Sequence, residues 1–188
     1  MKIQNKIILL AGLIIFSANP VFAQLKFKII SDNIYISDGS IVFKPSKYIA
    51  KTDSLANILK KHPKDTIVLF THAVLVLKAN DQLAKPHPSI SELKNLQMAN
   101  AEADTALKTG MTDIRLKVLR AQLLKSLAYQ YSADERWQFS KDQIQSRRSA
   151  FLGYQNSANM EFDNLANLDV TNAYDYQKQK TNNAYPIQ

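Results

Sequence analysis

The side chains best suited to acid–base or metal chemistry in this sequence are three histidines and one acidic pair. His62 and His87 lie in expected loops, and neither has a histidine or carboxylate nearby at metal-ligand spacing. His72 lies on an apolar segment, where a hydrogen-bonded core histidine is the commoner arrangement. Asp134 and Glu135 lie in a polar connection, where helix capping explains them more simply than catalysis does. The sequence therefore predicts no metal site and no catalytic pair.

Motifs for phosphate, nucleotide or thiol chemistry are also missing from the sequence. The chain has 4 glycines and no cysteine, which excludes glycine-rich phosphate loops, thiol catalysis, thiolate metal ligands and disulfides. We therefore expect a protein that is not an enzyme and that needs no cofactor. The alternative is a small periplasmic enzyme, or a small-molecule carrier, with its site between helices.

Aromatic and arginine side chains are concentrated in one stretch of the C-terminal half. Both types are enriched at the centres of protein interfaces. We predict that the binding residues are Tyr129, Trp137, Arg147, Arg148 and Tyr154. The alternative is that Trp137 folds inward with Phe139 and Phe151 and closes a helical hairpin.

The N-terminal residues have the features of a signal peptide. Lys2 and Lys6 precede an apolar run at 7–16, and Val21-Phe22-Ala23 resembles a cleavage site before Gln24. A run of about ten apolar residues is shorter than the roughly 20 that cross a bilayer. We therefore expect residues 1–23 to be removed and the mature chain to be periplasmic or secreted, without stable membrane insertion.

The charge of the chain is basic. Loss of Lys2 and Lys6 with the signal peptide would lower the formal net charge from +8 to +6. In an exported protein this charge favours acidic envelope partners over nucleic acid, so we expect no nucleic-acid binding. A merely solvated basic surface is the simpler explanation of the same charge.

Residues 24–45 have a strand-like pattern. Ile34 and Ile36 alternate on one expected strand, Ile41 and Phe43 on a second, and Asp38-Gly39 between them suits a tight turn. A lone hairpin is marginally stable in water, so it must pack on the helices. The alternative is a segment that orders only against a partner.

The rest of the mature chain has helical periodicity. Apolar residues at Leu116, Leu119, Leu123, Leu127 and Tyr131 define one face of a helix. The same period predicts helices over 46–61, 66–80, 89–108, 113–131 and 140–167, in one helical domain at 46–169. Asp65, Asp113 and Ser140 are placed to cap helices, and Gly110 to end one. The helix at 66–80 is apolar on all sides, which predicts burial at the centre.

Two successive helical hairpins begin at Asp65 and Asp113, 48 residues apart. Leu69, Ala73 and Val76 resemble the large, small, large positions of the first helix of a tetratricopeptide repeat (TPR), and Ala99, Ala103, Ala106 and Leu107 resemble its second. This resemblance implies an all-α fold of stacked antiparallel helical hairpins with a groove that binds peptides. A generic helical bundle is the alternative.

After Asp169 the sequence becomes polar, which predicts a flexible tail at 170–188. The sequence as a whole predicts an exported, TPR-like helical protein. Its expected role is a non-catalytic scaffold that binds a protein or peptide of the cell envelope.

Overall fold

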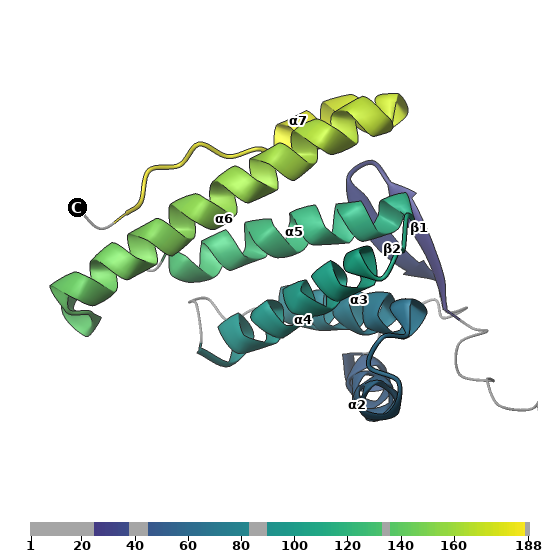
Figure 1. Cartoon of the computed structure of the whole chain (residues 1–188). Coiled ribbons are helices and arrows are strands. Elements are labelled where there is room, and N and C mark those ends of the chain that lie inside the picture. Colours follow the sequence, from purple (N-terminus) through teal and green to yellow (C-terminus); the bar gives the residue numbers. More distant parts are fainter. Residues whose placement is uncertain (1–24, 38–44, 83–89, 133–135, 187–188) are drawn as a thin grey trace, which may run out of the picture.

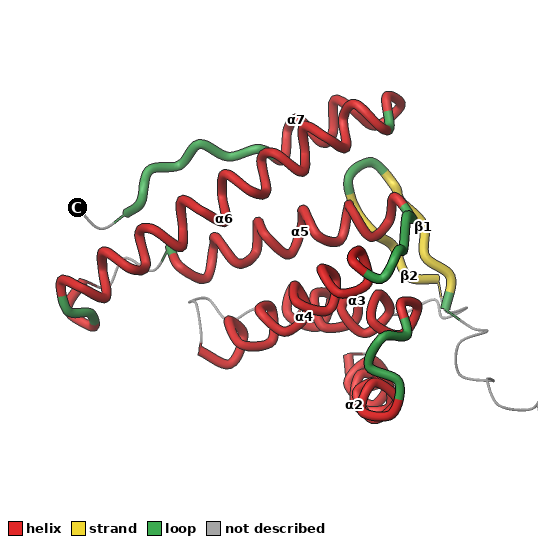
Figure 2. Tube along the Cα trace, in the orientation of Figure 1, coloured by secondary structure: helices red, strands yellow, loops and turns green. Residues whose placement is uncertain are grey.

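The computed structural model describes residues 25–37, 45–82, 90–132 and 136–186. Within these ranges the chain forms a strand hairpin followed by six helices (Figures 1 and 2). The elements are β1 (Lys26–Ile30), β2 (Asn33–Ser37), α2 (Pro45–Lys61), α3 (Thr66–Gln82), α4 (Ile90–Lys108), α5 (Ile114–Tyr131), α6 (Lys141–Leu168) and α7 (Ala173–Gln179), with 3-10 turns η2 (Arg136–Gln138) and η3 (Val170–Asn172). The expected signal peptide, residues 1–23, lies outside the described ranges.

The helices pack in the order in which they follow along the chain. Each of α2 to α6 contacts the next, and β1 and β2 contact α5. Figure 1 shows α5 and α6 side by side, whereas α2 is viewed nearly along its axis and is therefore strongly inclined to them. The prediction of stacked helical hairpins with a short N-terminal β-hairpin is confirmed. None of the described helices combines the length and apolarity needed to cross a membrane.

The helix boundaries follow from local capping chemistry. Asp65 accepts hydrogen bonds from the two backbone amides at 67 and 68, and Asp113 caps α5. Ser140 and Gln143 form a reciprocal capping box at the start of α6. Gly110, at φ 101°, follows α4 with hydrogen bonds typical of a glycine-terminated helix.

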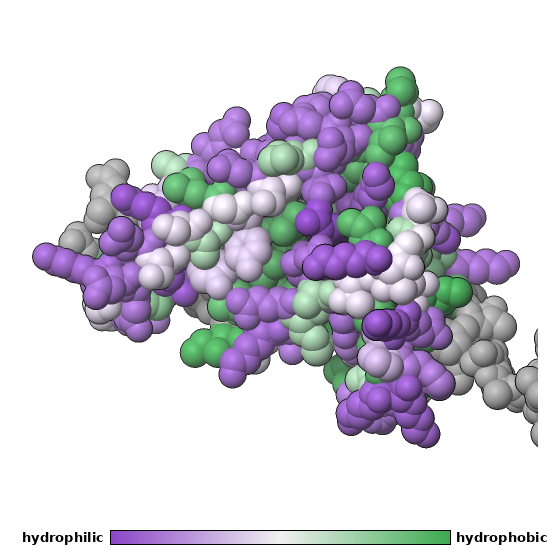
Figure 3. All heavy atoms as spheres, viewed as in Figure 1, coloured by the Kyte–Doolittle hydropathy of each residue, from purple (hydrophilic) through white to green (hydrophobic). Residues whose placement is uncertain are grey.

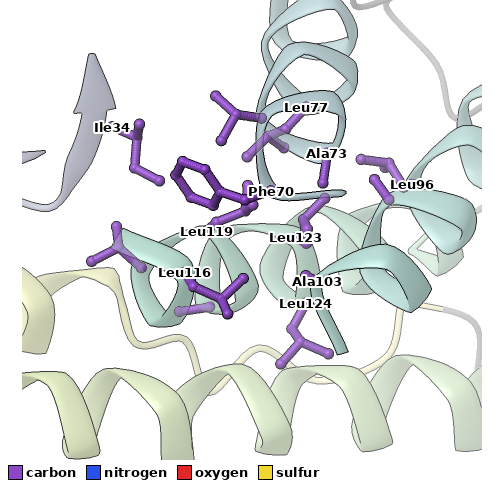
Figure 4. Close-up of a cluster of buried hydrophobic side chains, with 14 of the residues drawn as sticks. Ile34, Phe70, Ala73, Leu77, Leu96, Ala103, Leu116, Leu119, Leu123 and Leu124 are labelled. Atoms are coloured by element: carbon purple, nitrogen blue, oxygen red, sulfur yellow. The ribbon is translucent and has the colours of Figure 1, made fainter. Parts of the chain in front are cut away.

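The main buried cluster is formed by side chains of the hairpin and of α3 to α7, and Figure 4 shows part of it. Residues 68–77 of α3 are all buried, so the expectation of a buried central helix is confirmed. Ala99, Ala103 and Ala106 of α4 are fully buried, and such small side chains let neighbouring helices approach closely. Leu116, Leu119, Leu123 and Leu127 are buried as their spacing predicts. In Figure 4, Leu124 points from α5 towards α6.

The β-hairpin lies earlier in the sequence than predicted. Ile34 and Ile36 belong to its second strand, where they pair with Ile29 and Phe27. The turn is therefore at 31–32, and Ser31 adopts a positive φ of 57° there; the predicted turn at Asp38-Gly39 lies outside the described residues. The pairing places the four apolar side chains on one face, which packs against the helical core.

The polar C-terminal region, for which the sequence predicts a flexible tail at 170–188, contains η3 and α7 and is described to residue 186. Tyr176 of α7 is completely buried, and its hydroxyl donates to Asp169 at 3.0 Å. Burial and the adjacent Asp169 raise the pKa of Tyr176. Asp163 of α6 also accepts hydrogen bonds from Lys180 and Gln177, which attach α7 to α6.

Candidate functional site

Two of the predicted binding residues are exposed at the end of the α5–α6 hairpin. Trp137, on the turn η2, is 82% exposed, and Tyr129, in the last turns of α5, is 53% exposed. The alternative in which Trp137 folds inward is therefore wrong. Phe139 takes the inward position instead, because it packs with Ile144 and Tyr131 against a small cluster that contains Phe151.

Arg147 and Tyr154 belong to the packing that closes this end of the hairpin. The guanidinium carbon of Arg147 lies 4.3 Å from the ring centre of Phe139 and 5.3 Å from that of Tyr131. Its Nη2 atom donates to the carbonyl oxygen of Gln130 at 3.0 Å. Tyr154 stacks on Tyr131 at 5.7 Å, and burial raises the pKa of Tyr154. Arg147 and Tyr154 therefore take part in the packing between α5 and α6 at this end of the hairpin.

An extended stretch of polypeptide lies on the neighbouring face of α6. The chain reverses between α6 and α7, and after α7 it continues beside α6 towards the N-terminal end of that helix (Figures 1 and 2). We call residues 180–186 the extended segment. It contains no helix or strand, so its main-chain polar groups need partners outside the segment.

Side-chain amides of α6 supply some of these partners. Asn159 donates from Nδ2 to the carbonyl oxygen of Thr181 at 2.7 Å and accepts from the Thr181 N–H at 3.0 Å. Gln155 donates from Nε2 to the carbonyl oxygen of Asn183 at 3.2 Å and accepts from the Thr181 hydroxyl at 3.3 Å. An amide group is suited to this role because it carries a donor and an acceptor side by side.

The spacing of the amides matches the spacing of the extended main chain. Four residues of an α-helix rise about 6 Å, while two residues of an extended chain span about 6.6 Å. Residues 159, 155 and 151 of α6 therefore stay in step with residues 181, 183 and 185 of the segment. The helix can bind such a chain by its backbone over two helical turns.

Tyr185 is the main apolar contact of the extended segment. Its side chain is 6% exposed and packs against Phe151, with ring centres 5.6 Å apart, and against Ala128. The guanidinium carbon of Arg148 lies 5.7 Å from the Tyr185 ring centre. The Tyr185 hydroxyl oxygen is buried and has no hydrogen-bond partner among the described residues. The surroundings of Tyr185 therefore suit an unsubstituted phenyl ring better than a phenol ring, whose hydroxyl group gains no hydrogen bond from the described residues.

A cleft of about 340 Å³ opens between the extended segment and α5. Its lining includes Lys125 and Tyr129 of α5, Ser132 just after α5, and Phe151 and Gln155 of α6. Burial lowers the pKa of Lys125, and its ammonium donates to the Gln179 side chain at 2.5 Å. On the face that Figure 3 shows, hydrophilic residues surround smaller hydrophobic groups. The extended segment occupies one part of the α6 face, and this cleft is an open part of the same site beside the segment.

Of the predicted binding residues, the structure brings Tyr129 and Arg148 to this site, with Arg147 and Tyr154 beneath it. Sequence reasoning missed Gln155, Asn159 and Tyr185. The available signals were two amides one helical turn apart on α6 and a lone aromatic residue in a polar tail.

A second cleft, of about 470 Å³, lies between α2, α3 and α4. Its apolar wall includes Ala56 and Val76, and its polar residues include His72 and Asn80. His72 is buried, and its Nδ1 atom lies 2.6 Å from a carboxylate oxygen of Glu102. This pairing satisfies one ring nitrogen of a core histidine, as the sequence predicts for a structural residue.

No group of three histidine or acidic residues within the described ranges is arranged to hold a metal ion. No family model matches the sequence, and searches of curated proteins and of solved structures also gave no match.

Proposed function

We propose that this protein is an exported, non-catalytic scaffold of TPR-like helical hairpins that binds a protein or peptide of the cell envelope. The observation that carries this proposal is the extended segment, whose main chain is hydrogen-bonded by Gln155 and Asn159 of α6. A face that binds one extended chain through its backbone has the chemistry to bind another.

The groups that contact the segment favour binding over catalysis. Asn159 and Gln155 are amides, which do not titrate near neutral pH and are poor general acids or bases. Phe151 and Ala128 supply an apolar surface for an aromatic side chain. Such a combination of backbone hydrogen bonds and one apolar pocket is typical of sites for extended peptides.

The exposed aromatic residues support the same proposal. Tyr129 lines the open part of the cleft, and Trp137 is exposed at the end of the hairpin. Large exposed aromatic side chains near arginines are frequent at protein interfaces. The net positive charge of the chain favours acidic partners.

Photo-crosslinking in intact cells tests the proposal. A photoreactive phenylalanine analogue replaces Tyr129 in the cleft or, as a matched control, Tyr174 of α7, which is 69% exposed. We expect one reproducible envelope protein to crosslink from position 129 and not from position 174. Equal yields from both positions, or none from 129 with folded protein present, would contradict the proposal.

A small-molecule carrier is the second candidate, because the cleft between α2, α3 and α4 is large enough for a small ligand. The neutral fluorophore N-phenyl-1-naphthylamine is a suitable probe. Ala56→Trp would fill the cleft, whereas Ala50→Trp alters an exposed position of the same helix. The carrier is favoured if the probe's fluorescence rises with the wild-type and Ala50→Trp chains but not with the Ala56→Trp chain. If the fluorescence rises with none of them, this probe is not a ligand of the cleft.

A further inference from the structure

We propose that the extended segment occupies the partner's site in cis and that the partner binds by displacing it. The inference rests on the proposed function, because it assigns both the partner's chemistry and the regulation of the same face. The partner is inferred to be an extended polypeptide that runs antiparallel to α6. It carries a threonine or serine and, four residues later, an aromatic residue.

The first argument is that most of the recognition is independent of sequence. Asn159 and Gln155 bind the carbonyl oxygens at 181 and 183 and the amide N–H at 181, which every chain carries except for the proline N–H. The side chains of residues 182, 184 and 186 are exposed. Sequence information enters mainly through the Thr181 hydroxyl and the Tyr185 ring, and these two groups define the partner's pattern. The exposed side-chain oxygen of Asn182 adds a longer contact, since it accepts from Asn159 Nδ2 at 3.4 Å.

The second argument is that the fit of Tyr185 is incomplete. Its ring is buried against Phe151, yet its hydroxyl oxygen is buried without a hydrogen-bond partner among the described residues. A buried polar atom without a partner weakens binding. A partner with phenylalanine at this position would therefore compete favourably with the chain's own tyrosine.

The third argument is that residues 181–186 of the segment can leave without unfolding α7. Tyr176 is buried, and Lys180 donates to both carboxylate oxygens of Asp163 at 2.7 and 2.9 Å. These contacts fix the chain up to residue 180. Beyond that point the backbone contacts to Asn159 and Gln155 and the ring of Tyr185 are the contacts to be exchanged.

Because the segment is tethered, it has a high effective concentration at the face and suppresses binding of a free peptide. If the segment is bound in about 99 molecules of 100, the apparent affinity for a competitor falls by about 100-fold. A change that releases the segment while leaving α6 intact should restore that affinity.

Fluorescence anisotropy of a labelled synthetic peptide tests this inference on the full-length chain. The peptide has the sequence of residues 180–186 with both ends blocked. Tyr185→Ala removes the aromatic contact of the segment, and Tyr174→Ala removes an exposed tyrosine of α7. We expect Tyr185→Ala to bind the peptide at least about tenfold more tightly than the wild-type and Tyr174→Ala chains do. Equal affinities in all three chains would overturn the inference.

A second pair of variants shows whether the peptide uses the proposed face. In the Tyr185→Ala chain, Asn159→Asp removes the donor to the Thr181 carbonyl with little change of shape, whereas Asn164→Asp alters an exposed position of the same helix. We expect only Asn159→Asp to abolish the gained affinity. Unchanged binding by the Asn159→Asp chain would overturn the inference.

Molar mass measured by light scattering identifies a different occupant. If the wild-type chain forms a dimer that Tyr185→Ala dissociates, the segment of a second copy fills the face, and the inference of a foreign partner is wrong. Photo-crosslinking at position 129 judges the proposed function separately: a crosslinked partner together with equal peptide affinities would leave the proposed function standing and remove the displacement.

Discussion

Hydrogen exchange at Thr181 should report how firmly the extended segment is held. The Thr181 N–H donates to Asn159, about two helical turns along α6 from the aromatic contact of Tyr185 with Phe151. Tyr185→Ala deletes a ring that is 6% exposed. Burial of an aromatic side chain of this size contributes about 2 to 3 kcal/mol.

That loss should be concentrated in local opening of the segment. Residues 182–184 are exposed and Tyr185 lies near the end of the described chain, so the segment can detach while the core between α3 and α5 stays packed. A loss of about 2 to 3 kcal/mol corresponds to exchange of the Thr181 amide that is faster by about 30- to 150-fold. The rate of an unprotected amide sets the upper limit of this increase.

The assay is native-state hydrogen exchange by NMR on the wild-type, Tyr185→Ala and Tyr174→Ala chains. The free energy of global unfolding, measured in urea, should change far less than the local opening does. Tyr174→Ala should leave exchange at Thr181 within about twofold, because Tyr174 is 69% exposed and its ring contacts Lys178. A Thr181 amide that is unprotected in the wild-type chain, or that exchanges equally in all three, would refute the reasoning.

Three further predictions concern the same segment, its attachment and the core. Tyr185→Phe removes a buried hydroxyl without a partner and should slow exchange of the segment by about tenfold, since such groups cost about 1 to 3 kcal/mol. The hydrogen bond from Lys180 lowers the pKa of Asp163 in the folded chain. The pair should therefore stabilise the attachment of α7 at pH values above about 3.9, the pKa of an unfolded aspartate, and this stabilisation should be lost as the pH falls through the lower pKa of the folded chain. An acid titration followed by NMR measures this loss. Leu119→Ala should lower the free energy of unfolding in urea by about 2 to 5 kcal/mol, because Leu119 is fully buried. Trp137→Ala should change it by less than about 0.5 kcal/mol.

Each of these predictions has a result that would count against it. Faster exchange in Tyr185→Phe would mean that the hydroxyl has a partner. Identical acid titrations of the wild-type and Asp163→Asn chains would show that the pair with Lys180 contributes nothing. Equal losses of stability from Leu119→Ala and Trp137→Ala would contradict the assigned burial of both residues.

The helices could be predicted because their signals are local. Asp65, Asp113 and Ser140 cap helices through amides two or three residues away, and Gly110 ends one through its own backbone conformation. The leucine period of α5 similarly needs no distant information. These features belong to short stretches of sequence, so a single sequence is sufficient to find them.

The hairpin was misplaced because its register depends on distant packing. Asp38-Gly39 is the stronger local turn signal, whereas the observed turn uses Ser31 at a φ that non-glycine residues rarely adopt. Phe27 packs edge-on against Phe70 of α3 at 5.2 Å. Contacts of this kind select the pairing of β1 with β2.

The extended segment could not be predicted for a related reason. Its polar composition with few aliphatic residues is typical of disorder. Its order depends on Asn159 and Gln155, which lie more than twenty residues earlier in the chain, and on burial of Tyr185 against Phe151. Periodicity does not report such contacts. Trp137 illustrates a second limit, since the sequence leaves both exposure and inward folding open and the structure exposes it.

The most direct test of the binding face combines crosslinking with the amide variant. Photo-crosslinking from position 129 is measured in intact cells for chains that carry either Asn159→Asp or the control Asn164→Asp. A partner that binds through its backbone needs the Asn159 donor, so we predict that Asn159→Asp abolishes the crosslinked product and that Asn164→Asp retains it. Equal product from the two folded chains would contradict the central claim that α6 binds an extended partner by its main chain.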